Sequence, residues 1–329
     1  MENQSTSPQV IEAIKNKSAT WQAVKQEIKK VIVGQDAIIE RAFIGLLCNG
    51  HLLLEGVPGL AKTTLIKTIS QAIGLQFSRI QFTPDLLPAD LLGTLIYNPK
   101  TQEFQTRKGP IFTNLLLADE INRAPAKVQS ALLECMQERQ VTIGDTTFKL
   151  DNNFLVLATQ NPIDQEGTYR LPEAQVDRFM FKLLMHYPSY EEEKLIISKS
   201  FHPLPVLKSI EPQEIVEHRE LVNNIYVDEK VVEYILNIVF ATRNPKDYQL
   251  DDIAPFIEYG ASPRASIAIN QAIRAHAFLR RRHFVTPDDV KAIVPDILRH
   301  RIMLTYEAEA DNVTTDQVIQ QILRVIPSP

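Results

Sequence analysis

The stretch "EGVPGLAKTT" (55–64) has nearly the composition of a phosphate-binding loop. The usual pattern is G-x-x-x-x-G-K-[ST]; here Gly56 opens it, Lys62 and Thr63 close it, and Ala61 stands in place of the second glycine. In such a loop backbone N–H groups surround phosphate oxygens, the lysine reaches the β- and γ-phosphates, and the hydroxyl holds Mg²⁺. Because one glycine is missing, an ordinary glycine-rich turn stays an alternative at this point.

The residues on either side have the pattern that a phosphate loop needs. "HLLLEG" (51–56) is a short apolar run, typical of a strand buried on both faces. "TTLIKTISQAIG" (63–74) has apolar residues at helical spacing and a final glycine, which indicates a helix whose N-terminus favours anions. We expect Ala61 to fit easily in the first turn of this helix, since the missing glycine supplies only a backbone N–H. The loop residues predicted to contact a nucleotide are Gly56, Val57, Pro58, Gly59, Leu60, Ala61, Lys62, Thr63 and Thr64.

A second motif, "NLLLADEINRAP" (114–125), places Asp119 and Glu120 directly after an apolar run. Open α/β sheets bind ligands at the carboxyl ends of their strands, where this pair would lie. In a phosphate-loop ATPase the first carboxylate holds the hydration shell of Mg²⁺, and the second activates the attacking water. Alone, such a pair often caps the next helix. Together with the loop it predicts an ATP-hydrolysing site, with Mg²⁺ held by Thr63 and Asp119 largely through water.

Three further apolar runs predict the remaining strands of a sheet. They are "FSRIQF" (77–82), "NFLVLATQNP" (153–162) and "RFMFKLLM" (178–185). Asn161 would lie at the tip of the second, where it could position the lytic water or sense the γ-phosphate; asparagine before proline is also typical of a turn. Strands that alternate with helices predict an α/β fold with a parallel sheet and helices on both faces.

Four stretches together resemble the MoxR family of AAA+ ATPases. They are "GVPGLAKT", "LLLADEINRAPAKVQSALLECMQERQVTIG", "ATQNP" and "LPEAQVDRFMF". The resemblance is dense over residues 30–190 and looser in the C-terminal part. Because the family's loop carries alanine before the lysine, Ala61 fits its pattern. The resemblance implies an AAA+ core with a parallel five-stranded sheet flanked by helices, followed by a small all-helical lid domain.

The same resemblance implies roles for residues outside the two motifs. Asn161 matches the sensor-1 position, and Arg178 in "LPEAQVDRF" matches an arginine finger that enters the site of a neighbouring subunit. Arg264 in "GASPRA" (260–265) matches the sensor-2 position, which approaches the γ-phosphate from the lid.

The segment "VIVGQDAII" resembles the part of the family that lies over the adenine, with Ile32, Val33 and Gly34 as the contacting residues. The role of Arg123 stays open between a subunit interface and a surface position that starts a helix.

Two hairpins are predicted from turn residues between β-rich runs. "GTLIYNPKTQEFQTRKG" (93–109) and "QVTIGDTTFKL" (140–150) match the positions of the helix-2 and presensor-1 inserts. In related rings these loops face the pore or the partner. Tyr97, Phe104 and Phe148 could make contacts there or pack inward.

Composition limits the class of protein. The net charge of −5 over 329 residues argues against a nucleic-acid binder, and the basic run "LRRRHF" (279–284) fits a helix C-terminus. The two cysteines, Cys48 and Cys135, lie in helical patterns and predict no disulfide framework. A polar N-terminus and the lack of a long apolar run predict a cytoplasmic protein without a membrane span.

Changes in composition and in the spacing of apolar residues along the chain predict four segments. Residues 1–30 form a helical extension, 31–186 the nucleotide-binding core, 187–227 a helical and proline-rich connector, and 228–329 the lid.

The expected function is ATP hydrolysis by a ring, with a hexamer as the default. The resemblance implies a chaperone-like role in assembly, maturation or activation of partner complexes, together with a von Willebrand factor A domain protein. A non-catalytic nucleotide-dependent scaffold and a DNA-remodelling motor are the alternatives. No part of the sequence identifies the client protein.

Overall fold

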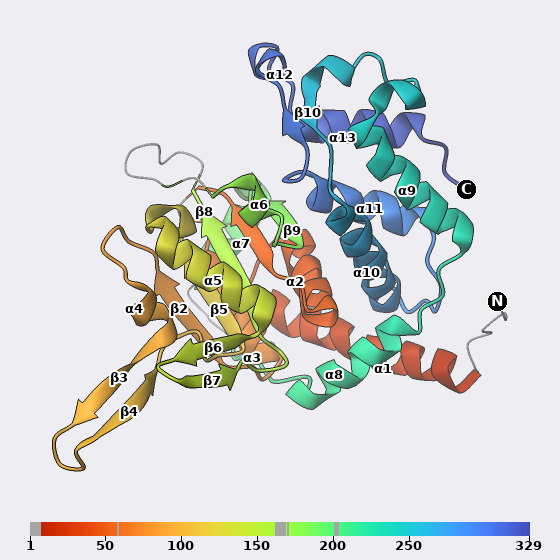
Figure 1. Cartoon of the computed structure of the whole chain (residues 1–329). Helices are drawn as coiled ribbons and strands as arrows, with labels where there is room; N and C mark the ends of the chain where they lie inside the picture. Colours follow the sequence, from red (N-terminus) through yellow and green to blue (C-terminus); the bar gives the residue numbers. More distant parts are fainter. Residues whose placement is uncertain (1–7, 58, 162–168, 170, 201–203) are drawn as a thin grey trace. The chain divides into compact units, whose positions relative to one another are not determined.

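The computed structural model describes residues 8–57, 59–161, 169, 171–200 and 204–329 (Figure 1). Its chain divides into two compact units. The sheet unit comprises Gln22–Phe179 and Leu183–Val216; the helical unit comprises Met1–Trp21, Met180–Lys182 and Glu217–Pro329. The segment boundaries expected from the sequence, at residues 30, 186 and 227, stay predictions.

A five-stranded sheet forms the centre of the sheet unit. Its strands are β1 (Leu52–Glu55), β2 (Phe77–Gln81), β5 (Leu115–Asp119), β8 (Leu155–Gln160) and β9 (Phe181–Leu184). They lie in the order β2-β5-β8-β1-β9, and β5 pairs in parallel with β2 and β8, as does β8 with β1. The predicted parallel five-stranded sheet is confirmed. The carboxyl ends of β1, β5 and β8 therefore meet at one edge, which we call the sheet edge.

Both faces of this sheet are buried, because successive side chains of a strand point to opposite sides. On one face Leu116 and Val156 pack in a core that includes Leu132 of helix α5 (Ala126–Glu138). On the other face helix α2 (Asp36–Cys48) comes so close that a β-carbon on Gly45 would lie 2.6 Å from Leu52 Cδ1. The continuous apolar runs of these strands reflect this burial on both sides.

The helices of the sheet unit connect and cover these strands. They are α2 (Asp36–Cys48), α3 (Lys62–Ala72), α4 (Pro88–Leu92), α5 (Ala126–Glu138), α6 (Glu173–Val176) and α7 (Tyr190–Ser200). Two further helices, α1 (Pro8–Lys29) and α8 (Pro212–Asn223), have residues in both units. Within the described residues, no helix combines the length and the apolar character needed to cross a bilayer.

Both predicted hairpins are present. The first consists of β3 (Gly93–Asn98) and β4 (Glu103–Lys108), and it projects away from the sheet (Figure 1). The second consists of β6 (Gln140–Ile143) and β7 (Thr146–Lys149). Phe148 packs inward against the core and makes an edge-to-face contact with Phe112 at 6.0 Å, whereas Tyr97 and Phe104 are exposed.

The helical unit contains four longer helices, in keeping with the helical lid domain that the sequence predicts. They are α9 (Glu229–Arg243), α10 (Pro263–Leu279), α11 (Pro287–Leu298) and α13 (Thr315–Val325), with a short helix α12 (Tyr306–Ala310). Side chains cap α10 and α13: Ser262 accepts from the backbone N–H of Arg264, and Thr314 from that of Gln317. A two-stranded antiparallel ladder, β10 (Ile257–Tyr259) with β11 (Met303–Leu304), was not predicted, since such short strands have no readable period.

Candidate functional site

The loop between β1 and α3 turns through two residues with positive φ. Gly59 has φ 86°, and a β-carbon there would meet no atom of the described residues within 4 Å. Ala61 is the N-cap of α3 with φ 53° and ψ 28°, which is left-handed. The expectation that alanine fits easily here was wrong, because this conformation costs an L-residue about 1–2 kcal/mol that glycine avoids. Pro58 lies outside the described residues.

Lys62 begins α3 and points back into the loop. Its Nζ donates a hydrogen bond to the carbonyl oxygen of Gly56. Burial of the ammonium lowers the pKa of Lys62, and the negative charges of Asp119, Glu120 and Glu55 oppose that lowering. A bound phosphate would add negative charge beside this cation and favour its charged form.

Asp119 is the last residue of β5, and donors from two neighbouring strands hold its carboxylate. The hydroxyl of Thr159 on β8 donates to Oδ1 at 2.6 Å. The guanidinium of Arg79 on β2 donates to Oδ2 through Nε at 3.1 Å and Nη2 at 2.8 Å. The carboxylate is therefore fixed in orientation by both adjacent strands.

Glu120 follows with φ 55° and ψ 52°, again a left-handed backbone. The Gln81 amide donates to its Oε2 at 2.8 Å, and Arg123 Nη1 donates to the same oxygen at 3.1 Å. Arg79 in turn donates to Gln81 Oε1 at 2.9 Å, which orients the amide so that its nitrogen faces Glu120. Arg123 thus has a partner within the chain.

The two motifs line one polar cleft of about 410 Å³ at the sheet edge. Asn161, which follows β8 and is 7% exposed, forms part of its wall. The lining residues are Gly59, Leu60, Ala61, Lys62, Thr63, Thr64, Arg79, Gln81, Asp119, Glu120 and Asn161. The structure therefore brings together the loop, the acidic pair and the sensor-1 candidate, as the sequence predicts.

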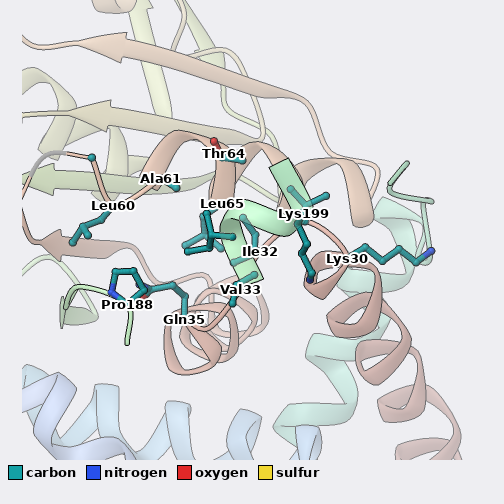
Figure 2. A pocket seen from close by; sticks show the side chains of 13 residues that line it. Lys30, Ile32, Val33, Gln35, Leu60, Ala61, Thr64, Leu65, Pro188 and Lys199 are labelled. Carbon is teal, nitrogen blue, oxygen red and sulfur yellow. The ribbon is translucent and has the colours of Figure 1, made fainter. Parts of the chain in front are cut away.

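An apolar cavity of about 310 Å³ adjoins the cleft on the other side of the loop. Figure 2 shows the side chains of Ile32, Val33 and Leu65 gathered together, with Pro188 on one side and Lys199 on the other. Cavity and cleft share these lining residues: Gly59, Leu60, Ala61 and Thr64. An apolar compartment joined to a polar one at a phosphate loop fits a nucleotide, with its base in the first and its phosphates in the second.

Gly34 lies beneath helix α7, which borders the cavity. A β-carbon on Gly34 would lie 2.5 Å from Glu192 Oε1 and would clash with it. The ammonium of Lys199, at the other end of α7, donates to the carbonyl oxygen of Lys29. This hydrogen bond joins the C-terminal end of α7 to the end of α1, three residues before Ile32.

Two oxygen-bearing side chains in the cleft are also suitable ligands for Mg²⁺. Thr63 offers a hydroxyl oxygen and Asp119 a carboxylate, and both are hard oxygen ligands of the kind this ion prefers. Few protein ligands are needed, because Mg²⁺ usually keeps several waters and binds substrate phosphates.

The two predicted arginines outside the cleft are both exposed. Arg178 lies in the turn after α6, and its side chain makes no hydrogen bond or ion pair with the part of the chain that the structure describes. Arg264 lies in the first turn of α10, in the helical unit.

Sequence reasoning missed Arg79, Gln81 and Thr159. A signal for the first two was present, since they alternate on the predicted strand 77–82 beside the acidic strand. Gln81 is in register with Asp119. The register of two strands far apart in the sequence is not readable from either one alone.

Comparisons with known proteins extend over nearly the whole chain. A model of the ATPase family associated with various cellular activities (AAA) matches residues 51–181, and an AAA lid domain model matches residues 250–322. "Chaperone MoxR1" of Mycobacterium tuberculosis is 51% identical over 304 residues, which cover 92% of this chain and 81% of that protein.

Two further relatives match a similar share of this chain. "Protein MoxR" of Methylorubrum extorquens is 27% identical, over 93% of this chain and 94% of its own length. A crystal structure of a protein from Cytophaga hutchinsonii, provisionally described as an ATPase, superposes with a TM-score of 0.91. It is 50% identical, and the match covers 98% of this chain and 97% of that one. The similarity therefore includes both the nucleotide-binding motifs and the C-terminal helices.

Proposed function

We propose that this chain, which belongs to the MoxR family of AAA+ ATPases, binds Mg-ATP at the sheet edge and hydrolyses it. The observation that carries the proposal is the convergence of Lys62, Asp119, Glu120 and Asn161 on one cleft beside the phosphate loop. The matching family model describes an AAA ATPase, and one relative carries the name chaperone.

The loop residues bind the phosphates in this proposal. Backbone N–H groups of Gly59 to Thr63 and the ammonium of Lys62 face the phosphate oxygens, and the N-terminus of α3 adds a partial positive charge. Thr63 and Asp119 would hold Mg²⁺, largely through water, and the ion when bound neutralises charge that develops on the transferring phosphoryl group. Val33 and Gly34 border the base.

Glu120 acts as the general base. Its carboxylate accepts a proton from the attacking water, whose orientation is assisted by the amide of Asn161. The donors on Oε2, from Gln81 and Arg123, leave Oε1 as the oxygen for that proton. In this proposal Asn161 orients the attacking water and Glu120 accepts its proton.

The two exposed arginines complete the site. Arg178 would enter the cleft of a neighbouring copy and neutralise transition-state charge, and Arg264 would sense the γ-phosphate from the lid. The side chain of Arg178 is exposed and has no hydrogen-bond or ion-pair partner among the described residues, which supports its role in a neighbouring site. A shared site requires a ring, and we propose a hexamer.

The ring would act on other proteins. The name "chaperone" of a relative that is 51% identical supports a role in the assembly, maturation or activation of partner complexes. We further propose cooperation with a von Willebrand factor A domain protein, on the strength of the family resemblance, and a location in the cytoplasm. ATP binding would draw lid and core together, and hydrolysis would release that closure as work on the client.

Replacement of Glu120 by Gln tests the proposed chemistry. The amide keeps the shape but cannot accept the proton, so hydrolysis should fall by about 10²- to 10⁴-fold while Mg-ATP still binds. Lys62→Ala should instead lose ATP binding, because the phosphate charge is left uncompensated. Phosphate release and equilibrium binding of a fluorescent ATP analogue measure the two properties separately.

Glu134→Gln is the matched control, because this exposed carboxylate lies on α5 of the same unit and faces no part of the cleft. It should leave the turnover rate unchanged. If Glu120→Gln hydrolysed ATP as fast as the Glu134→Gln control, the assignment of the base would be wrong.

A further inference from the structure

We infer that Thr159 is a positioning residue that holds both acidic groups of the site, Asp119 and Glu120, from the neighbouring strand. The inference rests on the proposed ATP hydrolysis and names a residue that acts through these two rather than on the nucleotide. It begins from one fully buried hydroxyl with two partners.

The β5–β8 ladder ends just before the acidic pair. Ala118 opposite Ala158 is the last registered pair of these strands. Beyond it, the backbone N–H of Glu120 donates to Thr159 Oγ1 at 2.8 Å. The side-chain hydroxyl thus takes the place of a strand carbonyl where the ladder has run out.

The same hydroxyl donates its only hydrogen to Asp119 Oδ1 at 2.6 Å. A threonine hydroxyl has one hydrogen to give and two lone pairs to accept with, so both bonds can form together. The hydroxyl hydrogen is committed to the carboxylate by the N–H that points at the oxygen. This arrangement fixes the carboxylate of one acidic residue and the backbone of the next.

The backbone of Thr159 pairs with β1, the other strand next to β8. Thr159 is in register with Leu54 of β1, and the next carbonyl, of Gln160, accepts from the N–H of Gly56 at 3.2 Å. The residue therefore lies between the strand that leads into the phosphate loop and the strand that ends in the acidic pair. Through Thr159, covalent geometry and three hydrogen bonds set the spacing between the phosphate loop and the acidic residues.

The left-handed backbone of Glu120 makes this support necessary. A non-glycine residue holds such a conformation only where its surroundings determine it, and the bond to Thr159 is made by its own N–H. Loss of the hydroxyl would leave that N–H without its acceptor and Asp119 with Arg79 as its remaining donor. Both carboxylates could then leave the orientation that the reaction needs.

Thr159→Val and Thr159→Ser separate the hydroxyl from the shape of the side chain. Valine keeps the shape and removes the hydroxyl, and should lower kcat by about 10- to 100-fold, the usual effect of losing a residue that orients a metal-site ligand. Serine keeps the hydroxyl and should retain most of kcat. Binding of ATP in EDTA should be the same for both variants, whereas the gain in ATP affinity on adding Mg²⁺ should shrink for valine alone.

Thr113→Val is the matched control. Thr113 also has a buried hydroxyl, which donates to the Gln76 carbonyl at 3.1 Å, but it precedes β5 and so lies at the opposite edge of the same sheet. It should leave kcat and the Mg²⁺-dependent gain in affinity unchanged. A loss in Thr113→Val equal to that in Thr159→Val would overturn the inference, as would an equal loss in the serine and valine variants.

Hydrogen exchange of the Glu120 amide, in the unmodified chain without nucleotide, gives a second measurement that needs no variant. We expect slow exchange, although this amide lies past the end of the ladder; fast exchange would overturn the inference even if Thr159→Val failed to fold. If the unmodified chain did not hydrolyse ATP, the proposed function would fail, while the exchange and the Mg²⁺-linked binding would still decide the role of Thr159.

Discussion

The sheet edge and the β3–β4 hairpin belong to the same unit, but the side chains of the first have partners within the chain and the aromatic side chains of the second are exposed. At the sheet edge the acidic side chains have donors within the chain, from Thr159 to Asp119 and from Gln81 to Glu120. On the hairpin Tyr97 is 50% and Phe104 68% exposed, and their rings contact mainly each other at 5.4 Å. The chain alone determines side-chain positions at the edge, whereas on the hairpin it determines only the strand ladder. We therefore expect substitutions at the sheet edge to change the rate of ATP hydrolysis, and substitutions on the hairpin to leave that rate unchanged.

Arg178 is exposed, yet its replacement should have the largest effect on ATP hydrolysis. Arg178→Ala should lower ATP hydrolysis by about 10³- to 10⁵-fold, the contribution of an arginine finger to a neighbour's transition state. Lys62→Ala should be inactive for a different reason, since its own cleft is damaged while its Arg178 is intact. When the two proteins are mixed, the intact cleft of an Arg178→Ala subunit can receive Arg178 from a Lys62→Ala neighbour. Hydrolysis should then reappear, with a maximum at intermediate ratios.

Dilution below the assembly concentration should abolish the recovered activity, which phosphate release measures directly. Verified mixed assemblies that stay inactive at every ratio would mean that Arg178 acts within its own chain or is structural.

The sequence predicted the sheet edge well because buried strands and motifs are local signals. The apolar runs that end in Gly56 and Asp119 have lengths and endings typical of buried parallel strands, and the fold they predicted is confirmed. The donors to the carboxylates were not predicted, because Thr159 meets Asp119 only through the register of two strands forty residues apart. Roles such as that of Arg178 came from the family resemblance, and they stay predictions until measured.

The left-handed backbone of Ala61 should have a smaller effect, on stability. Ala61→Gly should raise the free energy of unfolding by about 0.5–1 kcal/mol. Relief of the left-handed conformation gains about 1–2 kcal/mol, and the greater freedom of glycine in the unfolded chain offsets about 0.4–1 kcal/mol of it. ATP binding should persist, because the backbone N–H remains. Urea unfolding monitored by circular dichroism measures the change.

Ala131→Gly, within helix α5, is the control of opposite sign. A right-handed helical position gives glycine no relief, so this variant should lower the free energy of unfolding by about 0.5–1 kcal/mol. Equal destabilisation by both substitutions would show that Ala61 is not strained.

The smallest effect is expected on the hairpin itself. Tyr97→Ala with Phe104→Ala removes an aromatic pair that the chain leaves exposed, and a cross-strand pair of this kind contributes about 0.2–1 kcal/mol to the free energy of unfolding. ATP turnover should stay at the parent rate, because no atom of the pair lines the cleft. Phe148→Ala, in the neighbouring hairpin, is the control; its ring packs on the core and against Phe112, so its loss should cost more than the pair does. If urea unfolding showed the double variant to be the less stable of the two, the exposed pair would be part of the folded core, and the contrast between hairpin and sheet edge would not hold.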